Sequence, residues 1–178
     1  FVPELFEHPF EDLTVEDEDG SRVVLTGKID RVDVAADGRL RVVDYKMAGD
    51  RGKYATLLKK ESLGETSFQM PVYLLAAARE MERASGAPFT RFTARYWLLR
   101  RLDPLDRGFA DGKEDFTGFF ATDPVARHAL GEENFFNRLC GKVRGMKGGD
   151  FQITPRECGF CECGSVCRYV AVMMREEG

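Results

Sequence analysis

The first third of the chain contains three segments in which hydrophobic and polar residues alternate, as they do in strands that bury one face. These segments are Phe10–Glu16, Arg22–Val34 and Leu40–Lys46. An acidic, glycine-ending turn separates the first two, and a short loop containing Asp37 and Gly38 separates the last two. The pattern predicts three strands joined by turns.

The sequence pattern in the middle of the chain predicts helices. The polar segment after the third strand favours a loop with a short helical turn near Tyr54–Lys60. A helical pattern then runs from about Phe68 to Ala84, with Thr66 or Ser67 as the N-cap and Gly86 just beyond its end. These are the usual start and stop signals of a helix.

The last part of the chain is mixed. Phe92–Leu99 alternates and is rich in aromatic residues, so it predicts a further strand, whereas Asp103–Pro124 contains glycines and prolines and predicts an irregular excursion. Pro124–Lys147 suits a helix, and Cys158–Met174 holds a cysteine cluster and a last helix. Strands mixed with helices in this order predict a mixed α/β domain.

Composition narrows the class of protein. The chain has 178 residues, which suits one domain, and its 43% hydrophobic content is ordinary for a globular protein. It shows neither a long apolar run nor a signal peptide, so we expect no membrane association and a cytoplasmic location. The first residue is not Met, and we expect the chain to be a fragment of a longer protein. The net charge of −4 is unusual for a stand-alone nucleic-acid binder.

The hairpin around Asp37 carries the chemistry. Asp30 lies on its first strand, and Asp44 and Lys46 lie on its second. Buried charges cost several kcal/mol each unless they are paired or bind a metal, and carboxylates are the ligands that Mg²⁺ and Mn²⁺ prefer. We therefore expect a catalytic site, the alternative being a surface ion-pair cluster worth about 0–1 kcal/mol.

The length of the hairpin loop decides whether these groups meet. A two-residue turn places Asp30 opposite Tyr45 and puts the two carboxylates on opposite faces. A three-residue loop, 36–38, with its last glycine in the left-handed conformation, places Asp30 opposite Asp44, with Lys46 on the same face. We predict the second arrangement because it brings the three groups together.

Four motifs follow one another along the chain. They are Gly27-x-Ile29-Asp30-Arg31-Val32-Asp33, then Asp44-Tyr45-Lys46, then Gln69-Met70-Pro71-Val72-Tyr73, and last Cys158-x-x-Cys161 with Cys167. In this order they resemble the PD-(D/E)xK nucleases over roughly residues 5 to 170, and specifically the RecB-like branch. The cysteine motif resembles the C-terminal iron–sulfur motif of AddB-type helicase–nucleases and CRISPR-associated exonucleases.

The resemblance implies a restriction-endonuclease-like fold, with a mixed central sheet flanked by helices and a C-terminal cysteine-rich segment. Residues 1–150 would form the nuclease core. Residues 151–178 would hold the cysteine cluster and last helix as part of the same domain. An N-terminal helix and the first cysteine of the family pattern have no counterpart in this chain.

The resemblance also implies roles for the hairpin residues. Asp30, Asp44 and the main-chain carbonyl of Tyr45 would hold Mg²⁺ or Mn²⁺, which would activate a water molecule. Lys46 would orient that water or neutralise developing charge. Gln69 and Tyr73 share one helix face and would lie beside the lysine; the alternative is a capping glutamine and a core tyrosine.

Other charged residues are less specific. Glu7 is a candidate metal ligand by the resemblance, although Glu4 or Glu11 can be confused with it, and His8 is expected to be an ordinary exposed residue. Arg31 and Asp33 are expected to pair or to support the hairpin. Three loop lysines are candidates for contacts with the DNA backbone, although charged loops are usually just solvated: Lys53, Lys59 and Lys60.

Five cysteines, three of them at metal-ligand spacing, favour metal-bound thiolates in a reducing compartment over disulfides. Cys158, Cys161 and Cys167 supply three ligands, whereas zinc or a [4Fe–4S] cluster needs four. Cys163 can substitute at a cramped spacing, and Cys140 is expected to be a small buried hydrophobe. We expect the cluster in the full-length protein, and its absence or incompleteness in this chain.

These features predict a metal-dependent deoxyribonuclease domain, specifically the nuclease module of a helicase–nuclease in DNA repair or recombination. Its partners would be DNA and a helicase domain or subunit. A non-catalytic DNA-binding module stabilised by a metal or cluster is the alternative, and the intact acids and lysine speak against it. A zinc-binding interaction domain is a third possibility that leaves the hairpin carboxylates unexplained.

Overall fold

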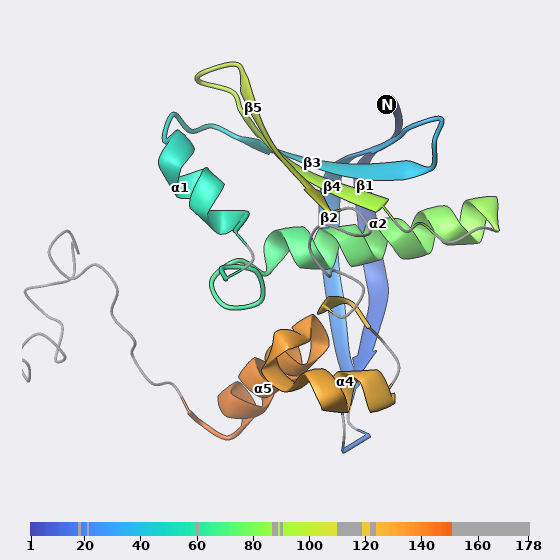
Figure 1. The fold of residues 1–178 in the computed structure, drawn as a ribbon, viewed down its shortest axis with the longest axis vertical. Coiled ribbons are helices and arrows are strands. Elements are labelled where there is room, and N and C mark those ends of the chain that lie inside the picture. Colours follow the sequence, from blue (N-terminus) through green and yellow to red (C-terminus); the bar gives the residue numbers. More distant parts are fainter. Residues whose placement is uncertain are drawn as a thin grey trace, which may run out of the picture. The chain divides into compact units, whose positions relative to one another are not determined.

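The computed structural model describes residues 1–17, 19–20, 22–59, 61–86, 89, 91–109, 119–121 and 124–150. Contacts divide the chain into two compact units, Phe1–Val143 and Arg144–Gly178. The first unit contains the sheet and most of the helices (Figure 1). In the described part of the second unit, the helix Phe135–Lys147 ends in a turn, where Asp150 N donates to Gly145 O over 2.8 Å.

The first unit is built on a five-stranded mixed sheet. The strands are β1 (Val2–Glu16), β2 (Arg22–Val34), β3 (Arg39–Lys46), β4 (Arg91–Leu98) and β5 (Asp103–Phe109). They lie in the order β1-β2-β3-β4-β5, with β3 and β4 parallel and the other neighbours antiparallel. Four of these strands were predicted, although β1 begins at Val2 rather than at Phe10.

The loop between β2 and β3 has three residues, as predicted. Ala35 N donates to Arg39 O over 2.9 Å, which closes the loop. Gly38 has a φ of 76°, the left-handed conformation that glycine adopts without a steric penalty. The loop is therefore the bulged type that follows a three-residue connection.

This loop fixes how the two strands face each other. The ladder runs from the pair Val34–Leu40 to the pair Arg31–Val43. The next position along the same register brings Asp30 opposite Asp44. The alternative with a two-residue turn, which would have separated the two carboxylates, is excluded.

Strand β5 corrects an expectation. Residues from Asp103 were predicted to be irregular because Pro104 and Gly108 interrupt the pattern, yet Asp103–Phe109 pairs along the length of β4. A proline is tolerated here because β5 is the last strand in the order of the described sheet, where an N–H can be lost on the outer side. Residues 110–118 of the predicted excursion lie outside the described residues.

The described helices are α1 (Arg51–Leu57), α2 (Gln69–Ser85), α4 (Pro124–Leu130) and α5 (Phe135–Lys147), with a 3₁₀ turn η1 (Gly131–Glu133). None of these helices is both long and apolar enough to cross a membrane. Helix α2 ends at Gly86 in the left-handed conformation, as predicted. Its predicted cap is wrong: Phe68 occupies the N-cap position, without a side-chain hydrogen bond.

The single helix predicted over Pro124–Lys147 is interrupted. Gly131 has a φ of 52°, and a new helix, α5, starts after Asn134. The buried Asn134 side chain supports the break, since its Oδ1 accepts from Phe136 N over 2.9 Å and its Nδ2 donates to Ala121 O over 3.0 Å. A buried cap of this kind stabilises the start of a helix.

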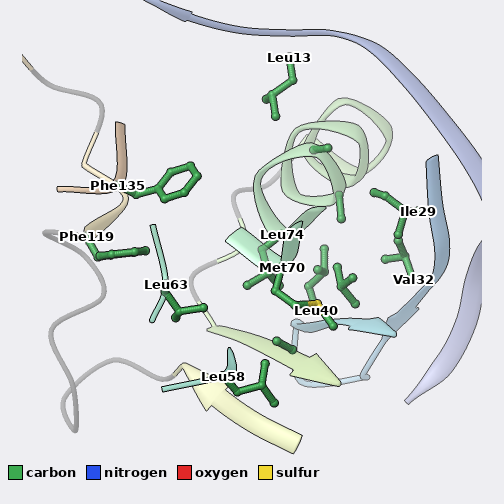
Figure 2. Packing of buried hydrophobic residues seen from close by; sticks show 14 of the residues in the cluster. Leu13, Ile29, Val32, Leu40, Leu58, Leu63, Met70, Leu74, Phe119 and Phe135 are labelled. Carbon is green, nitrogen blue, oxygen red and sulfur yellow. The ribbon is translucent and has the colours of Figure 1, made fainter. Parts of the chain in front are cut away.

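The core lies between the sheet and α2 (Figure 1). Figure 2 shows Met70 and Leu74 of α2 next to Leu40 of β3 and Val32 of β2, all nearly inaccessible to solvent. This packing presses the first turns of α2 against the strand that carries Asp44, and it thereby positions the candidate site.

Candidate active site

Asp44, Lys46 and Gln69 form a compact polar cluster where β3 meets the start of α2. Lys46 Nζ lies 2.7 Å from Asp44 Oδ2 and donates to Gln69 Oε1 over 3.1 Å. Gln69 Nε2 donates to Asp44 Oδ1 over 2.9 Å. The strand supplies the two charges on one face because they are two residues apart, and α2 supplies the amide that links them.

Tyr73 extends this cluster by one helical turn. Gln69 Nε2 lies within hydrogen-bond distance of the Tyr73 hydroxyl, at 3.2 Å, as the spacing of four residues on a helix permits. The Tyr73 ring packs edge-on against Phe10 of β1, with centroids 6.1 Å apart. The ring of Tyr73 thus packs against the β1 side of the core, and its hydroxyl lies beside Gln69.

Asp30 joins the cluster from β2. Its Oδ2 accepts a hydrogen bond from Tyr45 N over 2.9 Å, which ties β2 to β3 just beyond the last ladder pair. Asp30 is close enough to Asp44 for its charge to raise the pKa of that carboxyl. The structure therefore brings together Asp30, Asp44, Lys46, Gln69 and Tyr73.

Asp44 is the electrostatically unusual member. Burial raises the pKa of Asp44; the ammonium of Lys46 opposes this rise, and the charge of Asp30 adds to it. Asp44 Oδ2 is buried, and it is paired with the Lys46 ammonium, which opposes the effect of burial on the pKa. Carboxylate oxygens are the ligands that a hard divalent cation takes.

Tyr96 is a part of the site that the sequence did not indicate. It pairs with Asp44 across the parallel β3–β4 ladder, and its ring centroid lies 5.8 Å from Lys46 Nζ. Burial raises the pKa of Tyr96 to about 12, so the phenol stays neutral at physiological pH. No local motif marks Tyr96, since its relation to Asp44 depends on pairing between distant strands.

Glu7 and His8 lie on β1, beside β2. The neighbouring pairs Phe6–Arg31 and His8–Ile29 place Glu7 opposite Asp30. The Glu7 carboxylate nevertheless forms an ion pair with Lys28, and both side chains are more than half exposed. Glu7 therefore does not join Asp44 in this geometry.

His8 is half-buried rather than exposed as expected. Its Nε2 lies 4.0 Å from Glu80 Oε2, a carboxylate on α2. Among the described residues, no three His, Cys, Asp or Glu side chains gather as a preformed metal site.

The pairing expected for Arg31 and Asp33 is confirmed and includes a third residue. Asp33 is fully buried and accepts from Arg31 Nε over 2.5 Å and from Arg41 Nη2 over 2.6 Å. Asp33 lies three residues after Asp30 on β2, and side chains alternate between faces along a strand, so Asp33 is on the other face of the hairpin. This triad supports the hairpin and does not belong to the candidate site.

The cysteines divide into two groups. Cys140 is buried in α5, as predicted for a small hydrophobe. Cys158, Cys161, Cys163 and Cys167 lie outside the described residues. The loop lysines Lys53 and Lys59 are exposed, and Lys60 also lies outside the described residues.

The sheet order and the flanking helices define a mixed α/β fold. The model of the PD-(D/E)XK nuclease superfamily matches residues 1–168, and the chain belongs to this superfamily. Its mixed five-stranded sheet with helices is the restriction-endonuclease-like architecture expected from the motifs. Members of this superfamily typically use divalent metal ions.

Comparison with solved structures gives a weaker likeness. The structure titled "Crystal structure of SSO0001" is 14% identical, with a TM-score of 0.43, over 92% of this chain and 59% of that one. The chain thus spans less than two thirds of the length of that protein. No curated protein matches the sequence.

Proposed function

We propose that this chain is a metal-dependent deoxyribonuclease domain that hydrolyses DNA phosphodiester bonds. The observation that carries the proposal is Asp44, a buried carboxylate whose pKa is raised by burial and whose Oδ2 lies 2.7 Å from the Lys46 ammonium. A buried carboxylate with a raised pKa and a specific charge partner is a frequent mark of a functional site. Membership of the nuclease superfamily agrees with this interpretation.

Asp30, Asp44 and the main-chain carbonyl of Tyr45 would hold Mg²⁺ or Mn²⁺, because hard cations favour carboxylate and carbonyl oxygens. When bound, such an ion polarises a phosphate oxygen and lowers the pKa of a water molecule. The two carboxylates that the hairpin brings together, Asp30 and Asp44, fit this demand.

The other residues would act on the substrate or support those that do. Lys46 would orient the attacking water or neutralise charge developing on the phosphate. Gln69 contacts both Asp44 and Lys46, so it would keep Lys46 in place when the charge near Asp44 changes. Tyr73 would hold Gln69 in the orientation that this requires.

We further propose that the chain is the nuclease module of a RecB-like, AddB-type helicase–nuclease in DNA repair or recombination, with DNA and a helicase domain or subunit as partners. The order of the four motifs supports this placement. Cys158, Cys161 and Cys167 would bind a [4Fe–4S] cluster in the full-length protein. A cluster needs four ligands, so one would come from outside this set.

The test is a cleavage assay with labelled single- and double-stranded DNA in Mg²⁺ or Mn²⁺, repeated with a chelator. We expect Asp44→Asn and Lys46→Met to lower the rate by roughly 10²–10³-fold, the effect of removing one group that stabilises a transition state. Asp37→Asn is the matched control: the same substitution in the same hairpin, but at the exposed loop, where Asp37 pairs with Arg39.

The variants must remain folded for this comparison. Because burial raises the pKa of Asp44, the neutral Asp44→Asn side chain should not destabilise the fold, and circular dichroism during heating checks this. Equal cleavage by wild type, Asp44→Asn and Lys46→Met would contradict the catalytic assignment. A wild type that cleaves neither DNA form with either ion would contradict the proposed function.

A further inference from the structure

Lys28 is a cation at the rim of the candidate site with no role in the assignment above. It lies inside the first motif, between Gly27 and Asp30 on β2. Its ammonium pairs with Glu7 of β1, and the side chains are 57% and 64% exposed. Lys28 therefore reaches solvent, whereas Lys46 is mostly covered, at 26% exposure.

Strand geometry places Lys28 next to the site. Lys28 lies two residues before Asp30 on β2, and its ion-pair partner Glu7 lies opposite Asp30 on β1. Glu7 is the main cause of the raised pKa of Lys28, and the carboxylate of Asp30 adds to it. The Lys28 ammonium thus lies beside the strand position that carries Asp30.

The candidate site has no cation assigned to the phosphates next to the reacting one. Lys46 contacts Asp44 and Gln69, and under the proposed function both Lys46 and a divalent ion at Asp30 and Asp44 would act on the reacting phosphate. A DNA strand carries further phosphates on either side, and the acidic groups of this chain repel them. Phosphate contacts from Lys and Arg supply most of the affinity of non-specific nucleic-acid binding.

We infer that Lys28 binds a phosphate of the nucleic-acid strand next to the reacting one, an inference that rests on the proposed function. Glu7 holds the ammonium at the rim before the strand binds and gives it up to the phosphate. An exposed ion pair of this kind is weak, so the exchange is easy. Glu7 has a φ of 46°, a conformation that non-glycine residues rarely adopt and that clusters at functional sites.

The test measures binding of a fluorescein-labelled single-stranded oligonucleotide by anisotropy at several salt concentrations. It uses the Asp44→Asn chain, so that DNA is not cleaved. Adding Lys28→Ala should weaken binding and reduce the slope of log K against log salt by about 0.7, the value for one lost phosphate contact on a single strand. Lys28→Arg should keep the slope, because it keeps the charge.

Lys142→Ala is the matched control. Lys142 is an exposed lysine, 55% accessible, in an ion pair with Glu65. If the slope depended only on the net charge of the chain, Lys142→Ala and Lys28→Ala would therefore reduce it equally. We expect no change in its slope. An unchanged slope in Lys28→Ala, an equal reduction in Lys142→Ala, or no binding at any salt concentration would overturn the inference.

The two proposals can fail separately. If wild type cleaves DNA and Lys28→Ala leaves the slope unchanged, the nuclease assignment stands and the role of Lys28 is refuted. If Lys28→Ala reduces the slope while wild type does not cleave, Lys28 is a phosphate contact in a protein without nuclease activity.

Discussion

Two buried aspartates on neighbouring strands have opposite surroundings. Asp33 receives hydrogen bonds from both Arg31 and Arg41, whereas Asp44 has one ammonium and one amide. Burial alone would raise the pKa of Asp33, but the two guanidinium groups outweigh it and lower the pKa. Asp33 is therefore satisfied and stabilises the hairpin, whereas a single ammonium does not outweigh burial at Asp44, whose pKa is raised.

Removing Asp33 should be costly. Asp33→Ala leaves two largely buried arginines without their partner, and we expect a loss of about 3–5 kcal/mol in the free energy of unfolding at neutral pH. Urea unfolding measures this. The control is Asp37→Ala, whose partners Arg39 and Arg91 are exposed, with an expected loss of about 0–1 kcal/mol.

The same residue gives a pH dependence. Because the folded pKa of Asp33 is lowered, its contribution is fully present above the unfolded pKa of about 3.9. The contribution is lost as the pH falls through the lower, folded value. Wild type should therefore lose more stability on acidification than Asp33→Ala does.

Equal losses for Asp33→Ala and Asp37→Ala at neutral pH would show that the triad does not stabilise the hairpin.

At the level of elements, the site depends on how the β1–β2 ribbon meets α2. Gly27 of the first motif lies directly under the ring of Phe10, so that a Cβ there would lie 2.7 Å from Phe10 Cζ. Phe10 in turn packs against Tyr73, which contacts Gln69. The glycine thus allows the close approach that places α2 against the ribbon.

Adding a methyl group at Gly27 should disturb this contact. We expect Gly27→Ala to lower the free energy of unfolding by about 1–3 kcal/mol through overpacking. In the double variant Gly27→Ala/Phe10→Leu the losses should not add, with a coupling of roughly 0.5–3 kcal/mol, as for residues in contact. Chemical denaturation of the two single variants and the double variant gives this value.

Gly141 in α5 provides a control in which a Gly→Ala substitution should change the free energy of unfolding in the opposite direction. A Cβ there would meet nothing within 4 Å, and alanine in a helix interior is favoured over glycine by about 1 kcal/mol. Gly141→Ala should therefore be neutral or stabilising. Additive losses from Gly27→Ala and Phe10→Leu would contradict the proposed contact.

At the level of the whole molecule, the chain combines a net charge of −4 with a proposed substrate that is a polyanion. Lysines and arginines bind phosphates, and bound divalent ions offset the carboxylates of the site locally. Under the proposed function, ion binding and nucleic-acid binding should therefore be coupled, and both should depend on the same few residues near Asp44.

Ion binding should stabilise the folded chain. At a free Mn²⁺ concentration of 100 times Kd, the free energy of unfolding should rise by about 2.7 kcal/mol, a Tm increase of roughly 5–10 °C for a chain of this size. Thermal unfolding followed by circular dichroism measures this. Asp44→Asn should lose most of the shift and Asp37→Asn should keep it, whereas equal shifts in all three proteins would place the ion elsewhere.

Local chemistry explains what the sequence predicted well. The pairing of Asp30 with Asp44 follows from a strand period of two residues and from a glycine at the loop position that requires a positive φ. Gln69 and Tyr73 face the same way because they are four residues apart on a helix. These relations involve neighbours in the chain, so short motifs record them.

Packing between distant segments explains two errors of the sequence-based prediction. Pro104 suggests a loop, but the edge of a sheet tolerates a proline, and pairing with β4 overrides the local signal. Gly131 is one weak helix breaker within a helical pattern, and the burial of Asn134 decides that the helix is interrupted there. In both cases packing between distant segments prevails over local propensity.

The sequence by itself thus determined the hairpin, its acids and lysine, and the superfamily, because strand period, turn chemistry and motif spacing are properties of adjacent residues. Only the tertiary structure decided that Glu7 pairs with Lys28, that Tyr96 lies beside Asp44, and that Phe10 covers Gly27. These contacts join different strands and helices, and their geometry depends on how the sheet twists and how α2 packs against it, which no local pattern encodes.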